Sequence, residues 1–71
     1  MAAKGTIYGI NGPIVYLAGD FGFQMNEMVY VGEANLVGEV IGLTSERTTI
    51  EVYEETTGLK PGEPVTGTGA P

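Results

Sequence analysis

Glycine is distributed along this chain so evenly that it leaves little room for a helix. The 71 residues include twelve glycines, from Gly5 to Gly69, and the longest stretch free of glycine and proline runs from Leu43 to Thr57. Each glycine inside a helix costs about 1 kcal/mol relative to alanine. The stretch from Leu43 to Thr57 carries five threonines and no sustained apolar stripe at helical spacing. The glycine spacing therefore predicts an all-β fold.

Short strands are expected wherever apolar and β-branched residues alternate between turn residues. The predicted strands are Thr6–Ile10, Pro13–Ala18, Met28–Gly32, Leu36–Thr44, Arg47–Tyr53 and Pro64–Thr68. Short strands separated by turns every eight to twelve residues are typical of a small barrel or sandwich. We predict one domain, residues 1–71, folded as a small closed six-stranded antiparallel β-barrel.

Several short motifs fix where the chain should turn or bend. Asn11-Gly12 predicts a tight turn between the first two strands, and Thr44-Ser45-Glu46-Arg47 predicts a hairpin. Lys60-Pro61-Gly62-Glu63 is a turn by composition. Gly38 and Gly42 lie inside one predicted strand, so we expect a bulge or sharp bend there.

Composition excludes several classes of function. The chain has no histidine and no cysteine, which removes the usual zinc and copper ligands, disulfides and neutral-pH acid–base groups. Its net charge of −6 disfavours nucleic acid and anionic lipid. The longest apolar run, Ile14–Ala18, is too short to span a membrane. A cytoplasmic protein without nucleic-acid partners or direct membrane contact is expected.

One loop holds residues that could be mistaken for a site. Gly19-Asp20-Phe21-Gly22-Phe23 lacks the Gly-Lys-Ser/Thr ending of a phosphate-binding loop, so a turn or loop is predicted. Phe21, Phe23, Met25 and Met28 lie close together in sequence. They predict an apolar lid over one end of the core, with an exposed contact surface for a partner as the alternative.

Carboxylates and tyrosines give no convergent chemistry. Glu54 and Glu55, with Glu51 nearby, predict a solvated acidic turn, because adjacent strand residues point to opposite faces. The tyrosines are expected to pack across strands rather than form a stacking platform, and they are Tyr8, Tyr16, Tyr30 and Tyr53. We predict no catalytic, cofactor-binding or metal-binding residues.

Three stretches together resemble one family. Ile10–Val15 resembles its opening hairpin, and Val31–Glu33 followed by Leu36–Ile41 resembles its middle strands. Val52–Val65, which reads VYEETTGLKPGEPV, is similar to its most distinctive segment. The family is the catalytic A subunit of archaeal-type V/A-type ATP synthases, and the resemblance is to the N-terminal β-barrel, from Gly5 to Gly69.

The resemblance implies a structural role. The full subunit would continue into a nucleotide-binding domain with a P-loop, which would use ATP and Mg, and then into a helical domain. Its barrel would meet those of B subunits in a crown that holds an alternating ring together. The parent complex, peripheral to the cell membrane, would couple ATP synthesis or hydrolysis to proton or sodium movement. This chain would be an isolated domain or a fragment, without catalysis or cofactor of its own.

Two other functions remain as alternatives. One is a free-standing β-barrel adaptor that binds a protein or peptide, and the other is a small acidic enzyme that uses carboxylates. The enzyme lacks any convergent group of side chains. We also expect the isolated domain to be monomeric, because its crown partners would be barrels of a different kind of chain and its own copies repel one another.

Overall fold

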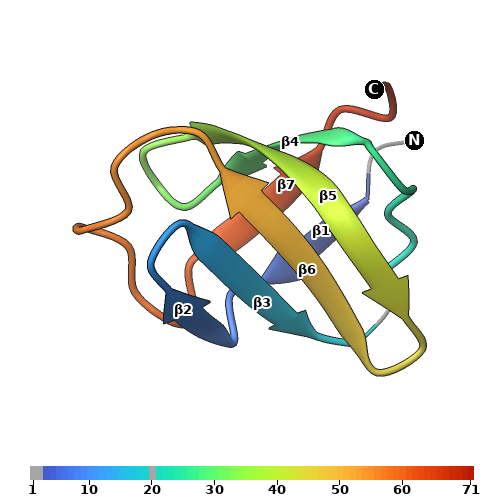
Figure 1. Cartoon of the computed structure of the whole chain (residues 1–71), viewed down its shortest axis with the longest axis horizontal. Coiled ribbons are helices and arrows are strands. Elements are labelled where there is room, and N and C mark those ends of the chain that lie inside the picture. Colours follow the sequence, from blue (N-terminus) through green and yellow to red (C-terminus); the bar gives the residue numbers. More distant parts are fainter. Residues whose placement is uncertain (1–2, 20) are drawn as a thin grey trace.

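The computed structural model describes residues 3–19 and 21–71, so that Met1, Ala2 and Asp20 of the predicted domain lie outside the described residues. Within those ranges the secondary structure consists of strands, turns and loops, without a helix (Figure 1). The predicted all-β fold is therefore confirmed.

The strands form one antiparallel sheet that curls around a single core. They are β1 (Lys4–Thr6), β2 (Gly9–Asn11), β3 (Ile14–Ala18), β4 (Met28–Val31), β5 (Leu36–Thr44), β6 (Arg47–Val52) and β7 (Pro64–Gly67). Their order across the sheet is β1-β7-β4-β5-β6-β3-β2. Every neighbouring pair is antiparallel. The curled sheet is a half-barrel (Figure 1).

The prediction of a closed six-stranded barrel is wrong, because the described residues form a sheet of seven strands with β1 and β2 at its two edges. The predicted strand Thr6–Ile10 is in fact divided between these edges. The N–H of Ile7 donates to Glu63 O, beside β7, whereas the N–H of Tyr8 donates to Tyr16 O in β3. The chain changes partner between these two residues, so the two edges of the sheet are the two halves of one segment.

The Asn11-Gly12 turn and the Thr44–Arg47 hairpin are both confirmed. Asn11 pairs with Ile14 and Thr44 pairs with Arg47, which leaves two residues in each turn. Gly12 has φ +59°. A positive φ followed by the fixed negative φ of Pro13 is the pattern of a type II′ turn, which matches the twist of a hairpin. Pro13 therefore belongs to the turn, and the strand predicted to start there begins at Ile14.

The two glycines inside β5 act differently. The register between β5 and β6 shifts between Val40 and Gly42, so Ile41 is the extra residue of a β-bulge. Gly38 lies where strands approach closely, because a Cβ there would be 2.9 Å from the carbonyl oxygen of Glu51 and 3.0 Å from Cγ2 of Ile50. The predicted bulge is confirmed at Gly42, and Gly38 is instead a point of close contact.

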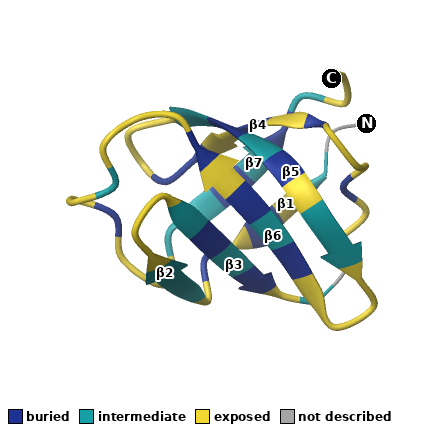
Figure 2. Cartoon of the chain, in the orientation of Figure 1, coloured by how far each residue is buried: buried dark blue, intermediate teal, exposed yellow. Residues whose placement is uncertain are grey.

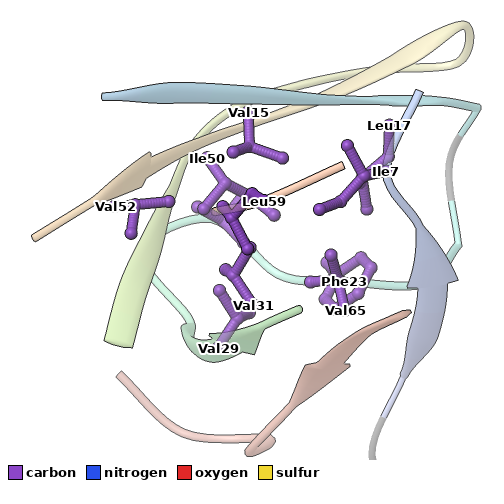
Figure 3. Close-up of a cluster of buried hydrophobic side chains, with 11 residues drawn as sticks. Ile7, Val15, Leu17, Phe23, Val29, Val31, Ile50, Val52, Leu59 and Val65 are labelled. Atoms are coloured by element: carbon purple, nitrogen blue, oxygen red, sulfur yellow. The ribbon is translucent and has the colours of Figure 1, made fainter. Parts of the chain in front are cut away.

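The core follows from the period-two alternation of the strands. Buried residues alternate with exposed or half-buried ones along β3, β4 and β6, and β3 and β6 appear as banded arrows in Figure 2. Among the described residues, eleven apolar side chains are buried, and Figure 3 shows them converging inside the curl of the sheet. They are Ile7, Val15, Leu17, Phe23, Val29, Val31, Val40, Ile50, Val52, Leu59 and Val65. Removing this apolar surface from water is the dominant favourable term in folding.

Candidate contact surface

A shallow hollow crosses the outer face of β2, β3, β6 and β5. Its floor is a row of positions in register: Gly9 pairs with Tyr16, Tyr16 with Thr49, and Thr49 with Gly42. The neighbours of Tyr16 and Thr49 along their strands are buried, so these two side chains point outward. Because glycine ends the row on both sides, no side chain fills the surface there. The hollow is therefore a consequence of where the glycines fall.

This hollow, which we call the outer groove, has a volume of about 910 Å³. Ile10 and Leu43 are partly buried and pack against the core, yet both also line the groove. Tyr8 also lines it and is 73% exposed. The groove thus combines apolar side chains with small residues on a rigid sheet, which suits contact with another protein.

Arg47 and Tyr16 give the groove its polarity. The guanidinium carbon of Arg47 lies 5.0 Å from the centre of the Tyr16 ring, in cation–π contact. Stacking on the ring leaves the N–H groups at the edge of a guanidinium able to donate to a carboxylate. The outward row on the other side of the floor joins Ile14, Glu51 and Glu39. Arg47 thus lines the groove together with Glu46, whereas Glu51 and Glu39 lie in the next row, beside the groove.

The predicted apolar lid is wrong for three of its four residues. Phe23 is buried and belongs to the core. Phe21, Met25 and Met28 are 38%, 53% and 36% exposed. The alternative interpretation, an exposed contact surface, fits Met28 best, because it lines a second hollow of about 250 Å³ that includes Tyr53 and Pro71. Asp20, in the predicted Gly19–Phe23 turn, lies outside the described residues.

Glu54 and Glu55, which follow β6, are exposed, as predicted for a solvated turn. Each carboxylate also accepts a hydrogen bond. Glu54 Oε2 accepts a hydrogen bond from the N–H of Val37 at 2.7 Å. Glu55 Oε1 accepts one from the hydroxyl of Thr57 at 2.8 Å. These carboxylates close the end of the sheet and do not converge on one point.

A small hydrogen-bonded group links β5 to the loop that precedes β4 and to the residue that follows β6. The Tyr53 hydroxyl and the Asn26 amide, the latter at 3.0 Å, both donate to the Glu39 carboxylate. The bond from Tyr53, and then that from Asn26, lowers the pKa of Glu39 below its ordinary 4.5, against a smaller opposing effect of burial. The same bond raises the pKa of Tyr53, with help from burial and from the nearby Glu39 and Glu51 charges. These hydrogen bonds join three segments at the surface of the domain.

The tyrosines only partly follow the prediction of cross-strand packing. Tyr16 is half-buried, and the guanidinium of Arg47 on the adjacent strand lies over its ring. Tyr8, Tyr30 and Tyr53 are 73%, 39% and 58% exposed. No local pattern in the sequence links Tyr16 to Arg47, since their contact depends on the pairing of β3 with β6.

Among the described residues, no group of three or more acidic side chains is placed to hold a metal ion. In the same part of the chain, no helix is long and apolar enough to cross a membrane. The described surface is that of a curled sheet with an outward groove. These features define a small all-β module with a groove on its outer face.

Comparison with known proteins identifies the family. A family model described as "ATP synthase alpha/beta family, beta-barrel domain" matches residues 7–69, and the chain belongs to this family. It is 54% identical over its whole length to the V-type ATP synthase alpha chain of Halothermothrix orenii. It is 55% identical over its whole length to the A subunit of the A-type ATP synthase of Hyperthermus butylicus. Over 99% of its length it is 53% identical to the corresponding A subunit of Pyrococcus horikoshii.

The predicted resemblance to the barrel of the A subunit is therefore confirmed. The chain spans 12% of the length of the first two relatives and 7% of the third. The similarity thus covers the barrel region of those proteins.

Proposed function

We propose that this chain is the structural barrel of the catalytic A subunit of an A/V-type ATP synthase, and that it joins neighbouring subunits in a crown. The observation that carries the proposal is identity above 50% across the whole chain to A-type and V-type relatives. The parent complex would be peripheral to the cell membrane on its cytoplasmic side, and would couple ATP to proton or sodium movement. Catalysis, ATP and Mg would belong to the remainder of the subunit.

The outer groove supports this assignment as a contact surface for the barrel of a B subunit. A matching segment would place an apolar side chain on the glycine-flanked floor. It would bring a carboxylate to Arg47 and a basic group towards Glu51. Such paired charges steer association and set the register of two surfaces. Each contact is small, and several linked contacts in a ring reinforce one another.

The test is association with the purified B subunit of the same synthase, measured by sedimentation velocity. We expect the chain to co-sediment with the B subunit when each is present at about 100 μM, well within reach of a micromolar complex. Arg47→Ala should weaken the complex about tenfold, the equivalent of about 1.4 kcal/mol. Lys60→Ala removes an exposed cation away from the groove and is the matched control.

One result would contradict the assembly role, and another would contradict the groove as its contact surface. If the chain does not bind the B subunit even at several times that concentration, the assembly role is wrong and the free-standing adaptor becomes the better interpretation. If both variants bind as the unmodified chain does, the assembly role stands but the groove is not its contact surface.

A further inference from the structure

Glu27 is a buried carboxylate that the outer groove does not use. It lies directly before β4 and is 3% exposed, in a chain whose other described acidic residues are exposed or half-buried. A buried carboxylate is costly unless its oxygens accept hydrogen bonds. The donors that satisfy Glu27 therefore indicate what the residue holds in place.

Both oxygens accept hydrogen bonds from backbone N–H groups of different segments. Oε1 accepts from Gln24 at 2.8 Å, in the loop that precedes β4. Oε2 accepts from Gly69 at 2.8 Å, two residues beyond the end of β7. Hydrogen bonds from backbone N–H groups to a charged acceptor are among the stronger ones. One side chain thus joins two segments that are far apart in sequence.

The space for this carboxylate depends on a second residue. A Cβ at Gly67 would overlap Oε2 of Glu27 and would lie 3.2 Å from Cε1 of Phe23. Gly67 is the last residue of β7, where its missing side chain admits the carboxylate beside the core. The position of the Glu27 carboxylate therefore requires glycine at position 67.

The segment beyond β7 bends at the point where Glu27 holds it. Thr68 donates to the carbonyl of Met28 from its N–H at 3.0 Å and from its hydroxyl at 2.7 Å. Gly69 follows with φ +80°, and the carbonyl of Ala70 then accepts the N–H of Met28 at 2.8 Å. The bonds to Met28 are made on either side of the bend. The contact with Glu27 is made at the bend itself.

We propose that Glu27 is a positioning residue that clamps residues 68–70 and fixes the direction in which the polypeptide leaves the barrel. In a protein of the relatives' length, that direction would orient the barrel relative to the part that follows it. This last consequence depends on the proposed function, whereas the clamp is a property of the chain alone.

The test uses nuclear magnetic resonance of the 71-residue chain and its Glu27→Gln variant. Glutamine keeps the shape but is uncharged and has one acceptor oxygen, so the Gly69 N–H faces either an N–H donor or a weaker, neutral acceptor. We expect the Gly69 amide to exchange with solvent at least about tenfold faster, because one local bond to a charged acceptor is lost. The residual dipolar coupling of Gly69 should shrink, while those of Thr68 and Ala70, which keep their bonds to Met28, and of core amides such as Val52 change less.

Glu54→Gln is the matched control, because Glu54 also accepts one backbone N–H but is exposed. It should alter the Val37 amide and leave Gly69 unchanged. Unchanged exchange and unchanged dipolar couplings at Gly69 in Glu27→Gln would overturn the proposal.

If Glu27→Gln does not fold, a second measurement tests the clamp. It is the scalar coupling, in the unmodified chain, through the hydrogen bond from the Gly69 N–H to the Glu27 carboxyl carbon. Its presence supports the clamp and its absence overturns it. None of these measurements uses a second kind of chain, so this proposal and the proposed function fail separately.

Discussion

Replacing Gly38 by alanine should destabilise the sheet at its closest point of approach. Gly38 lies in β5, paired with Val29 on one side and Val52 on the other. The new Cβ would lie 2.9 Å from the Glu51 carbonyl oxygen and 3.0 Å from Cγ2 of the fully buried Ile50. The first of these atoms belongs to the backbone of β6, so the strand itself must shift to relieve the contact.

The magnitude follows from two opposing effects. Overpacking a well-packed core costs about 1–3 kcal/mol. The loss of unfolded-state entropy on replacing glycine by alanine stabilises by about 0.4–1 kcal/mol. We therefore expect Gly38→Ala to lower the free energy of unfolding by about 1–2 kcal/mol. In a domain of this size that corresponds to a fall in Tm of roughly 4–15 °C.

Gly9→Ala is the matched control, because Gly9 also lies in a strand but has no heavy atom within 4 Å of the new Cβ. It should leave stability unchanged or raise it by up to about 1 kcal/mol. Urea unfolding followed by circular dichroism gives both values, and an unchanged m-value shows that the comparison is valid. If Gly38→Ala is as stable as Gly9→Ala, the argument from close approach is refuted.

Three further outcomes are expected. Because the Tyr53 hydroxyl lowers the pKa of Glu39 below 4.5 and has its own pKa raised above 10.0, their bond stabilises the fold between these values. The stability difference between the unmodified chain and Tyr53→Phe should therefore shrink as pH falls below 4.5 through the lowered pKa of Glu39, and as pH rises above 10.0 through the raised pKa of Tyr53. A constant difference in urea unfolding across both of these pH ranges would contradict this. Titration with Mg-ATP should give no saturable chemical-shift changes, since the net charge of −6 repels a triphosphate; specific shifts at low millimolar ligand would show a binding site. The chain should sediment as a monomer near 7.4 kDa at low salt. A tight homo-oligomer there would favour the adaptor interpretation.

Local patterns predicted most of the strands because their residues report burial directly. β5 has the predicted bounds, and β6 lacks only the predicted last residue, Tyr53. The alternation of Thr48, Ile50 and Val52 with exposed or half-buried residues is sufficient to orient β6. Turn residues such as Gly12 were found because a positive φ is itself a local preference of glycine.

Features that the sequence did not reveal depend on contacts between distant segments. The division of the predicted strand Thr6–Ile10 depends on which partner each half finds. No local pattern separates Phe23, which enters the core, from Phe21, which is 38% exposed. Glu27 looks like any polar loop residue until Gly69 is placed beside it.

The shared origin of the two sheet edges has a consequence during synthesis on the ribosome. β2 can pair with β3 soon after both emerge, because only the turn at Gly12 and Pro13 separates them. β1 must wait for β7, since Lys4 pairs with Thr66 near the other end of the chain. Contacts between residues so far apart in sequence form slowly. In a nascent chain β1 therefore stays unpaired until β7 has left the exit tunnel, and the arrival of β7 completes the sheet.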